Sequence, residues 1–199
     1  MSEDGIGRVL VASLHQSIAE HLPARLGFYE NWLSAAKLRD GVIGLAPLYA
    51  VLSFLRQEGP VYDTITARAG YYAAQWTVES MPTLRRSIIR RAPLWLRARL
   101  LMRVVNHIVR SSYHGSRAVA TIRKGTARID VRASVFCVVR EPVEHPLCTY
   151  YAAACARLLA LFDLDTDVQV VTCRGTGERS CILTMAVSRE LAGNGAVPP

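Results

Sequence analysis

Three cysteines in the last third of the chain have the residue type and spacing of a metal site. Cys148 opens an apolar segment, and Cys173 and Cys181 flank a loop of seven residues that contains two glycines. Hydrophobic residues alternate with polar ones into and out of this loop, which predicts a β-hairpin over 166–187 with one thiol near the end of each strand. A helix start that faces a hairpin tip would bring the three thiols together. Such a cluster suits a thiophilic metal, and we expect a structural zinc ion.

A tetrahedral zinc site needs a fourth ligand, and the sequence leaves its identity open. Glu178 in the loop and His145 before the apolar segment are both candidates. Cys137 and Cys155 are interpreted as packing residues, because free cysteine is among the most buried residue types. The alternative for the whole set is that every thiol is simply a small buried side chain.

The elements that must position these residues can be read from hydrophobic spacing. Helical spacing predicts helices over 6–22, 28–39, 48–56, 61–80, 83–91, 94–112 and 146–162. Strands are expected over 118–123 and 127–132 around a Lys124-Gly125 turn, over 135–140, and in the cysteine hairpin. Helices followed by a β-β-β-α-β-β order predict an α+β fold with a mainly antiparallel sheet. We divide the chain into an N-terminal helical extension over 1–40, a main domain over 41–190 and a flexible tail over 191–199.

The positive charge belongs to one region. The 199 residues carry a net charge of +8, yet no acidic residue lies between Glu79 and Asp130, where twelve of the 24 Lys and Arg residues fall. A solvated helix face is one interpretation, and contact with an anionic membrane surface is the other. Nucleic-acid binding is disfavoured because no helix-turn-helix, zinc-finger or RNA-binding signature accompanies the charge. The predicted basic surface comprises Arg85, Arg86, Arg90, Arg91, Arg97, Arg99 and Arg103.

Several classes are disfavoured by what the sequence lacks. No apolar run approaches the roughly 20 residues of a membrane-spanning helix, and the N-terminus has no signal-peptide layout. Five cysteines without such a signal predict reduced thiols in the cytoplasm, with peripheral contact to the inner membrane as an open alternative. No dinucleotide-binding fingerprint, nucleophile elbow or metalloprotease motif is present, which argues against an enzyme.

Five segments in a particular order resemble a known family. They are Gly70-Tyr-Tyr-Ala-Ala-Gln-Trp76, the arginine-rich helices that end near His107, Phe136-Cys137, Pro146-Leu-Cys148, and the Cys173 to Cys181 loop. Together, over roughly 40–187, they resemble the 4-vinyl reductase domain family, and most closely its branch associated with bacteriochlorophyll synthesis in photosynthesis. The resemblance implies a dimeric α/β domain with an apolar pocket, and in some members a phenol-binding sensor with a structural zinc. Zinc-binding sensor relatives carry a glutamate three residues before the first hairpin cysteine, where this chain has Val170.

The resulting hypothesis is a non-catalytic protein that binds or carries a hydrophobic, ring-bearing ligand, a tetrapyrrole intermediate of bacteriochlorophyll biosynthesis. A vinyl reductase acting on a chlorophyllide-type substrate and a dimeric sensing or scaffold module are the alternatives. Expected partners are the ligand and either a second copy of the chain or another protein. The predicted ligand-binding residues are Tyr71, Tyr72, Trp76, His107, Tyr150 and Tyr151.

Overall fold

The structure is a computed structural model that describes residues 6–33, 44–164 and 166–187. The helices are α1 (Arg8–His21), α2 (Leu26–Glu30), α4 (Leu45–Gln57), α5 (Val61–Glu79), α6 (Thr83–Arg91), α7 (Leu94–Ser112) and α8 (Thr149–Ala160). The strands are β1 (Arg117–Arg123), β2 (Thr126–Arg132), β3 (Val168–Thr172) and β4 (Cys181–Ala186). Short 3₁₀ helices, η1 (Pro23–Arg25), η2 (Val135–Cys137) and η3 (Arg174–Thr176), lie between them. The predicted α+β class with an antiparallel sheet is confirmed.

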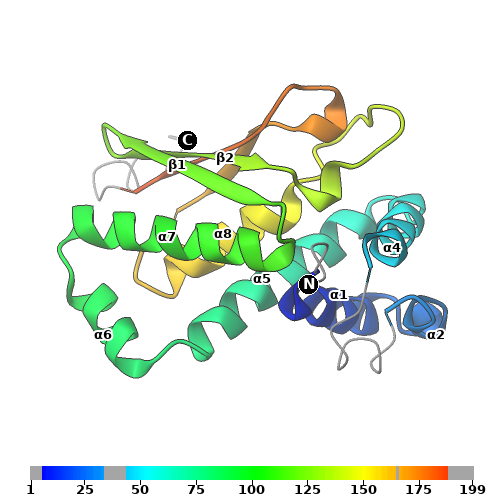
Figure 1. Cartoon of the computed structure of the whole chain (residues 1–199), viewed down its shortest axis with the longest axis horizontal. Helices are drawn as coiled ribbons and strands as arrows, with labels where there is room; N and C mark the ends of the chain where they lie inside the picture. Colours follow the sequence, from blue (N-terminus) through cyan, green and yellow to red (C-terminus); the bar gives the residue numbers. More distant parts are fainter. Residues whose placement is uncertain (1–5, 34–43, 165, 188–199) are drawn as a thin grey trace, which may run out of the picture.

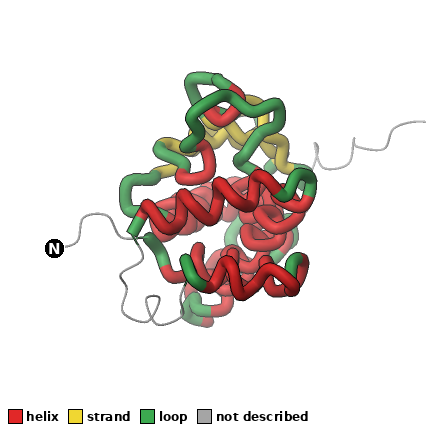
Figure 2. Tube along the Cα trace, turned by 90° about the vertical axis from the view of Figure 1, so that its right-hand side faces the viewer, coloured by secondary structure: helices red, strands yellow, loops and turns green. Residues whose placement is uncertain are grey.

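The four strands form one sheet in the order β1-β2-β4-β3, and every neighbouring pair is antiparallel. Between β1 and β2, Lys124 and Gly125 both have left-handed backbone angles, with φ of 46° and 74°. Two consecutive positive φ values are the geometry of the tight hairpin turn that matches strand twist. Helices α7 and α8 lie along one face of this sheet (Figure 1), and the strands gather at one side of the helical layer (Figure 2).

The predicted strand over 135–140 is wrong. Ala133 turns the chain with φ of 54°, and η2 follows it, so the observed order is β-β-α-β-β. Val135 and Phe136 are both fully buried, whereas a strand with one solvated face would expose one of the two. Phe136 stacks on Tyr150 of α8 with ring centroids 4.8 Å apart, and this packing holds the segment out of the sheet.

Helices α1, α5 and α8 build the centre of the core. Leu10, Leu14 and Ile18 of α1 are fully buried in the same cluster as the core of the sheet. Gly70 of α5 touches α8 so closely that an added Cβ would lie 2.0 Å from the carbonyl oxygen of Tyr150. The first helix therefore shares the core of the main domain. The predicted boundary at 40, the second half of the predicted 28–39 helix and the predicted tail lie outside the described residues.

Among the described helices, none combines the length and the apolar character needed to cross a bilayer.

Candidate functional site

Four thiols converge at one end of the sheet, and all four sulfur atoms lie within 4.8 Å of one another. The Cys137 sulfur lies 3.3 Å from that of Cys148, 3.4 Å from that of Cys173 and 3.5 Å from that of Cys181. The sulfurs of Cys148 and Cys173 are 3.6 Å apart. The four cysteines are free, and Cys137 is half-buried whereas the other three are buried. The three thiols predicted from the sequence do come together.

The cluster draws on segments far apart in the chain. Cys137 ends η2, Cys148 immediately precedes α8, Cys173 follows β3 and Cys181 begins β4. The hairpin tip is docked on the segment before α8, because the backbone N–H of Val143 donates to the carbonyl of Gly175 at 2.8 Å. Loop geometry and this docking together fix the four sulfur positions.

The fourth thiol corrects the sequence interpretation. Cys137 was expected to be a packing residue, and Glu178 or His145 to complete the metal site. Both of those side chains are exposed and neither belongs to the cluster, whereas Cys137 does. The cause is the replacement of the expected strand by η2, which redirects the Cys137 side chain. Cys155 lies outside the cluster and is buried, and burial raises the pKa of its thiol to about 12, which agrees with a packing role.

The thiols affect one another's ionisation. The pKa of Cys173 is lowered because Cys137, Cys148 and Cys181 lie within hydrogen-bonding distance of its sulfur, and the Leu147 N–H donates to it at 3.3 Å. The pKa of Cys148 is raised mainly by hydrogen bonding to the same neighbours, Cys137 first, which favours its protonated form, with smaller contributions from burial and from the charge of Cys137. A second backbone donor, the Arg174 N–H, reaches the Cys181 sulfur at 3.4 Å. The pKa of Cys137 is also lowered, by Cys148 first, whereas that of Cys181 is raised, by Cys137 first. A bound cation would favour the thiolate form of all four.

The arrangement fits zinc. With Zn–S bonds of about 2.3 Å, tetrahedral ligand sulfurs lie about 3.8 Å apart. Four of the six sulfur–sulfur distances are 3.3 to 3.6 Å and the other two are at most 4.8 Å, so the six bracket that value and side-chain rotations would admit an ion. Four protein ligands leave no open coordination position, which is the arrangement of a structural rather than a catalytic zinc.

The six predicted ligand-binding residues do not form one site. Tyr71, Tyr72 and Trp76 are half-buried on α5, where Tyr72 stacks on Trp76 with centroids 5.3 Å apart. His107 is exposed on α7. Tyr150 lies instead in the core on α8, as does Tyr151. Helices α5 and α8 touch directly at Gly70, and an open groove of about 540 Å³ on these two helices includes Tyr71 in its lining, whereas Tyr150 and Tyr151 do not line it.

The two core tyrosines nevertheless carry an unsatisfied polar group. Within the described part of the chain, the hydroxyls of Tyr62, Ser134, Tyr150 and Tyr151 are buried and have no hydrogen-bond partner. Burial raises the pKa of Tyr150 to about 12, although the nearby Ser112 and Ser13 hydroxyls act in the opposite direction. Burial also raises the pKa of Tyr151, with added repulsion from Tyr150, Cys148 and Cys137. The polar interior therefore borders the thiol cluster.

A groove of about 730 Å³ lies between α4 and the loop that continues from Cys137. Its volume falls in the range of small-molecule sites, about 300 to 1,000 Å³. The lining is partly apolar and includes two arginines and one glutamate: Tyr49, Ala50, Ser53 and Arg56 from α4, and Val138, Val139, Arg140, Glu141 and Val143 from the loop. Sequence reasoning missed this groove, although the valine pair directly after Cys137 was a signal for it.

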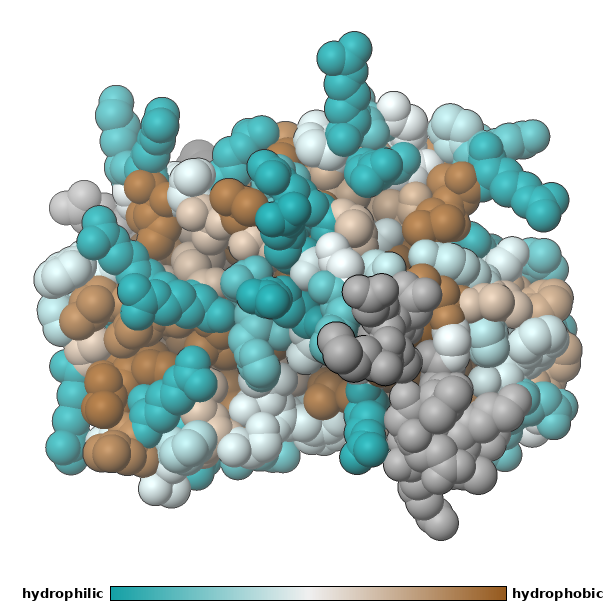
Figure 3. All heavy atoms as spheres, in the orientation of Figure 1, coloured by the Kyte–Doolittle hydropathy of each residue, from teal (hydrophilic) through white to brown (hydrophobic). Residues whose placement is uncertain are grey.

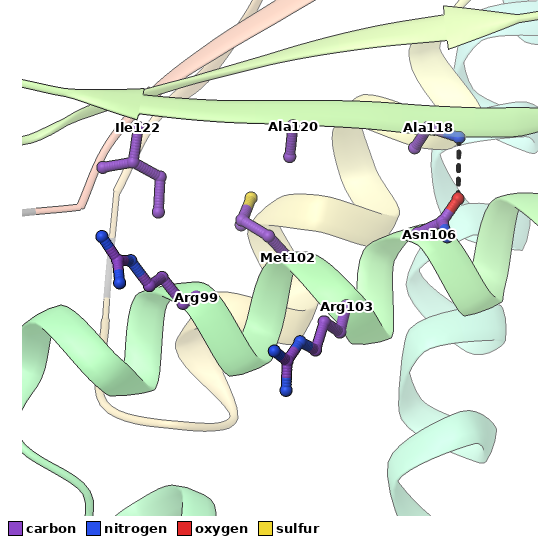
Figure 4. Close-up of a pocket in the computed structure, with 7 residues that line it drawn as sticks. All are labelled: Arg99, Met102, Arg103, Asn106, Ala118, Ala120 and Ile122. Atoms are coloured by element: carbon purple, nitrogen blue, oxygen red, sulfur yellow. Dashed lines mark hydrogen bonds between the residues drawn. The ribbon is translucent and has the colours of Figure 1, made fainter.

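A smaller groove of about 390 Å³ lies between α7 and the edge strand β1 (Figure 4). Met102 points toward Ala120, and Asn106 accepts a hydrogen bond of 3.0 Å from the Ala118 N–H. Arg99 and Arg103 stand at its rim, exposed as predicted.

The predicted basic surface is mostly exposed, but Arg97 does not belong to it. Its guanidinium donates to the carbonyls of Arg90 at 2.7 Å, Ala92 at 3.3 Å and Phe162 at 3.3 Å. Arg97 is half-buried and joins the end of α6 to the end of α8. This structural role corrects its assignment from the sequence.

Comparison with known proteins supports the fold. No family model matches the chain, and no curated protein matches it. Among solved structures, the crystal structure of the phenol-responsive sensory domain of the transcription activator PoxR with phenol aligns with a TM-score of 0.54 at 13% identity. The alignment covers 71% of this chain and 73% of that one. At this identity the likeness shows a shared α+β fold alone.

Proposed function

We propose that this chain is a zinc-stabilised domain that binds a small hydrophobic, ring-bearing molecule. The observation that carries the proposal is the continuity between the thiol cluster and the larger groove. Cys137 contributes its sulfur to the cluster, and the next residues, 138–143, form one wall of the groove. The N–H of Val143 then ties that wall to the hairpin tip. A metal held by the four thiols would therefore fix the shape of the groove.

The chemistry of the lining indicates the ligand class. Val138, Val139 and Tyr49 would pack against a ring, and Arg56 and Arg140 would meet an electronegative substituent. The fold is shared with a domain that is described as responsive to phenol, which supports a ligand of this kind. Zinc, if bound by Cys137, Cys148, Cys173 and Cys181, would supply rigidity and no reaction step.

The metal is tested by elemental analysis of protein prepared without chelator. We expect about one zinc per chain, and loss of the metal from both Cys137→Ala and Cys181→Ala. Cys155→Ala is the matched control, because Cys155 is a buried thiol outside the cluster. Full zinc retention by Cys137→Ala would mean that another residue is the fourth zinc ligand. Absence of zinc from the parent protein would refute the metal site.

The groove is tested by measuring the affinities of two probes, phenol and magnesium protoporphyrin. Each probe is titrated into the holoprotein and into protein from which a chelator has removed the metal. Ala50→Trp should obstruct the groove and weaken binding at least about tenfold. Ala24→Trp, at an exposed position of η1 outside the lining of the groove, is the matched control and should bind like the parent. Equal binding by the two variants would move the site elsewhere. Failure of both probes to bind below about 100 μM would refute the function.

The identity of the successful probe separates the finer hypotheses. Binding of the tetrapyrrole would support the resemblance to the bacteriochlorophyll branch of the 4-vinyl reductase domain family and a carrier role. Binding of phenol alone would favour a sensing module. The reductase alternative requires loss of a vinyl group in the presence of a nicotinamide or flavin reductant, which the same pigment assay would detect.

A further inference from the structure

The corner formed by α6 and the first turn of α7 exposes large apolar side chains. Leu84 is 72% exposed, Ile88 55% and Trp95 62%. Leu84 and Ile88 are four residues apart on α6, so they lie on one face of the helix. Ile89 is the buried residue of this helix. Single exposed hydrophobic residues are ordinary, but three within one short helical corner form a surface that favours a partner.

Arginines border these apolar side chains. Arg85 and Arg91 each lie three residues from Ile88, and both are exposed. The exposed Arg99 places its guanidinium 5.6 Å from the centre of the Trp95 ring. The ion pairs of the described residues are made by other side chains. Figure 3 shows hydrophobic atoms exposed among hydrophilic side chains over this part of the molecule.

Two neighbouring arginines have a different role. Arg97 binds the carbonyls at the ends of α6 and α8, and Arg90 points toward the Leu161 carbonyl at 3.5 Å. These contacts anchor the back of the corner to α8. The free surface therefore consists of Leu84, Arg85, Ile88, Arg91, Trp95 and Arg99, which we call the α6–α7 surface.

The mixture of apolar and basic side chains indicates which kind of partner binds this surface. A second copy of the chain would place arginines against arginines across a two-fold axis, which is unfavourable. Nucleic-acid phosphates would attract the arginines but leave Leu84, Ile88 and Trp95 in water. An anionic bilayer satisfies both sets, because apolar side chains enter the acyl boundary, tryptophan favours the interface and arginines meet lipid phosphates.

We propose that the α6–α7 surface docks on anionic lipid bilayers, lying in the interface without crossing it. The length of α6, nine residues, allows a shallow contact only. Insertion of Leu84 and Ile88 supplies a contribution that salt does not screen, whereas the attraction of Arg85 and Arg91 is screened. Binding should therefore weaken at high salt without disappearing.

The test is sedimentation of the full-length chain with vesicles of phosphatidylcholine alone or mixed with phosphatidylglycerol. We expect binding to the mixed vesicles and little to the neutral ones. Arg85→Glu/Arg91→Glu and Leu84→Ser/Ile88→Ser should each lower the partition coefficient at least about tenfold. The matched control is Arg123→Glu/Arg128→Glu, which makes the same charge change on exposed positions of the β1–β2 hairpin and should bind like the parent.

Three results would overturn the proposal. An equal loss in the β1–β2 hairpin control would show that net charge, and not this surface, governs binding. Parent-like binding by Leu84→Ser/Ile88→Ser would show that these two side chains do not insert into the bilayer. A change of oligomeric state in either surface variant, seen by analytical ultracentrifugation without vesicles, would make the surface an interface between copies. Circular dichroism establishes that each variant is folded.

Discussion

The thiol cluster and the α6–α7 surface are built in opposite ways. The cluster gathers four side chains from four segments, and Cys137 and Cys181 are 44 residues apart in the chain. The α6–α7 surface comes from one continuous stretch, residues 84–99, and its members face outward. The first depends on the tertiary fold and should contribute to it. The α6–α7 surface lies on the outside of the folded protein and should contribute little to its stability.

The largest expected effect concerns the cluster. Cys173→Ala should remove the metal and lower the free energy of unfolding by more than about 4 kcal/mol, since loss of a structural metal is among the most destabilising single changes. Cys155→Ala should cost about 1 to 2 kcal/mol, because it only empties a small buried volume. Denaturant unfolding with and without chelator measures both. If the two variants are equally stable, the cluster is ordinary core packing.

The next prediction compares the stability contributed by close helix contact in the core with that contributed by the metal. Gly70→Ala places a Cβ against the backbone of Tyr150, where no side-chain rotation can relieve it. We expect destabilisation of about 3 kcal/mol. Gly27 of α2 has nothing within 4 Å of an added Cβ, so Gly27→Ala should be neutral or stabilising by up to about 1 kcal/mol. A mild effect at Gly70 would mean that α5 and α8 can separate.

A smaller effect is expected from the polar contact between α1 and α5. Hydrogen bonds from Gln16, then Tyr72 and Arg68, hold the pKa of Glu20 at about 2, below its ordinary 4.5. A lowered pKa in the folded state stabilises the protein above about pH 4.5, and this contribution disappears as the pH falls through about 2. Because Glu20 is partly exposed, Glu20→Gln should lose only about 0.5 kcal/mol at pH 7.

The same comparison by denaturant unfolding at pH 2, where about half of the Glu20 carboxylates are protonated, should show a smaller difference between Glu20→Gln and the parent than at pH 7. An undiminished difference there would assign the effect to lost packing instead of charge.

The smallest stability effect is predicted for the α6–α7 surface. Arg85→Glu/Arg91→Glu should change the free energy of unfolding by less than about 0.5 kcal/mol, because both side chains are solvated. Thermal unfolding at matched ionic strength provides the measurement. A large loss would show that this surface is part of the fold, and the contrast with the thiol cluster would then disappear.

Features that depend on near neighbours along the chain could be predicted from the amino-acid sequence. Helical periodicity located α5, α6 and α7 to within two residues, because an amphipathic or apolar stripe repeats along one segment. The Lys124-Gly125 turn and the cysteine hairpin followed from strand alternation and turn residues. The run of arginines could be read in the same way, since residues close along a helix remain close in space.

The way in which distant segments meet could not be predicted and became visible in the folded protein. Stacking of Phe136 on Tyr150 replaced an expected strand with η2 and turned Cys137 into the fourth member of the cluster. The tyrosines of α5 came to lie half-buried and those of α8 in the core, and hydrogen bonds to the carbonyls of Arg90 and Phe162 drew Arg97 away from the basic surface. Each outcome depends on the packing of side chains remote in sequence, and hydrophobic spacing along one segment carries no information about which remote side chain fills a given space.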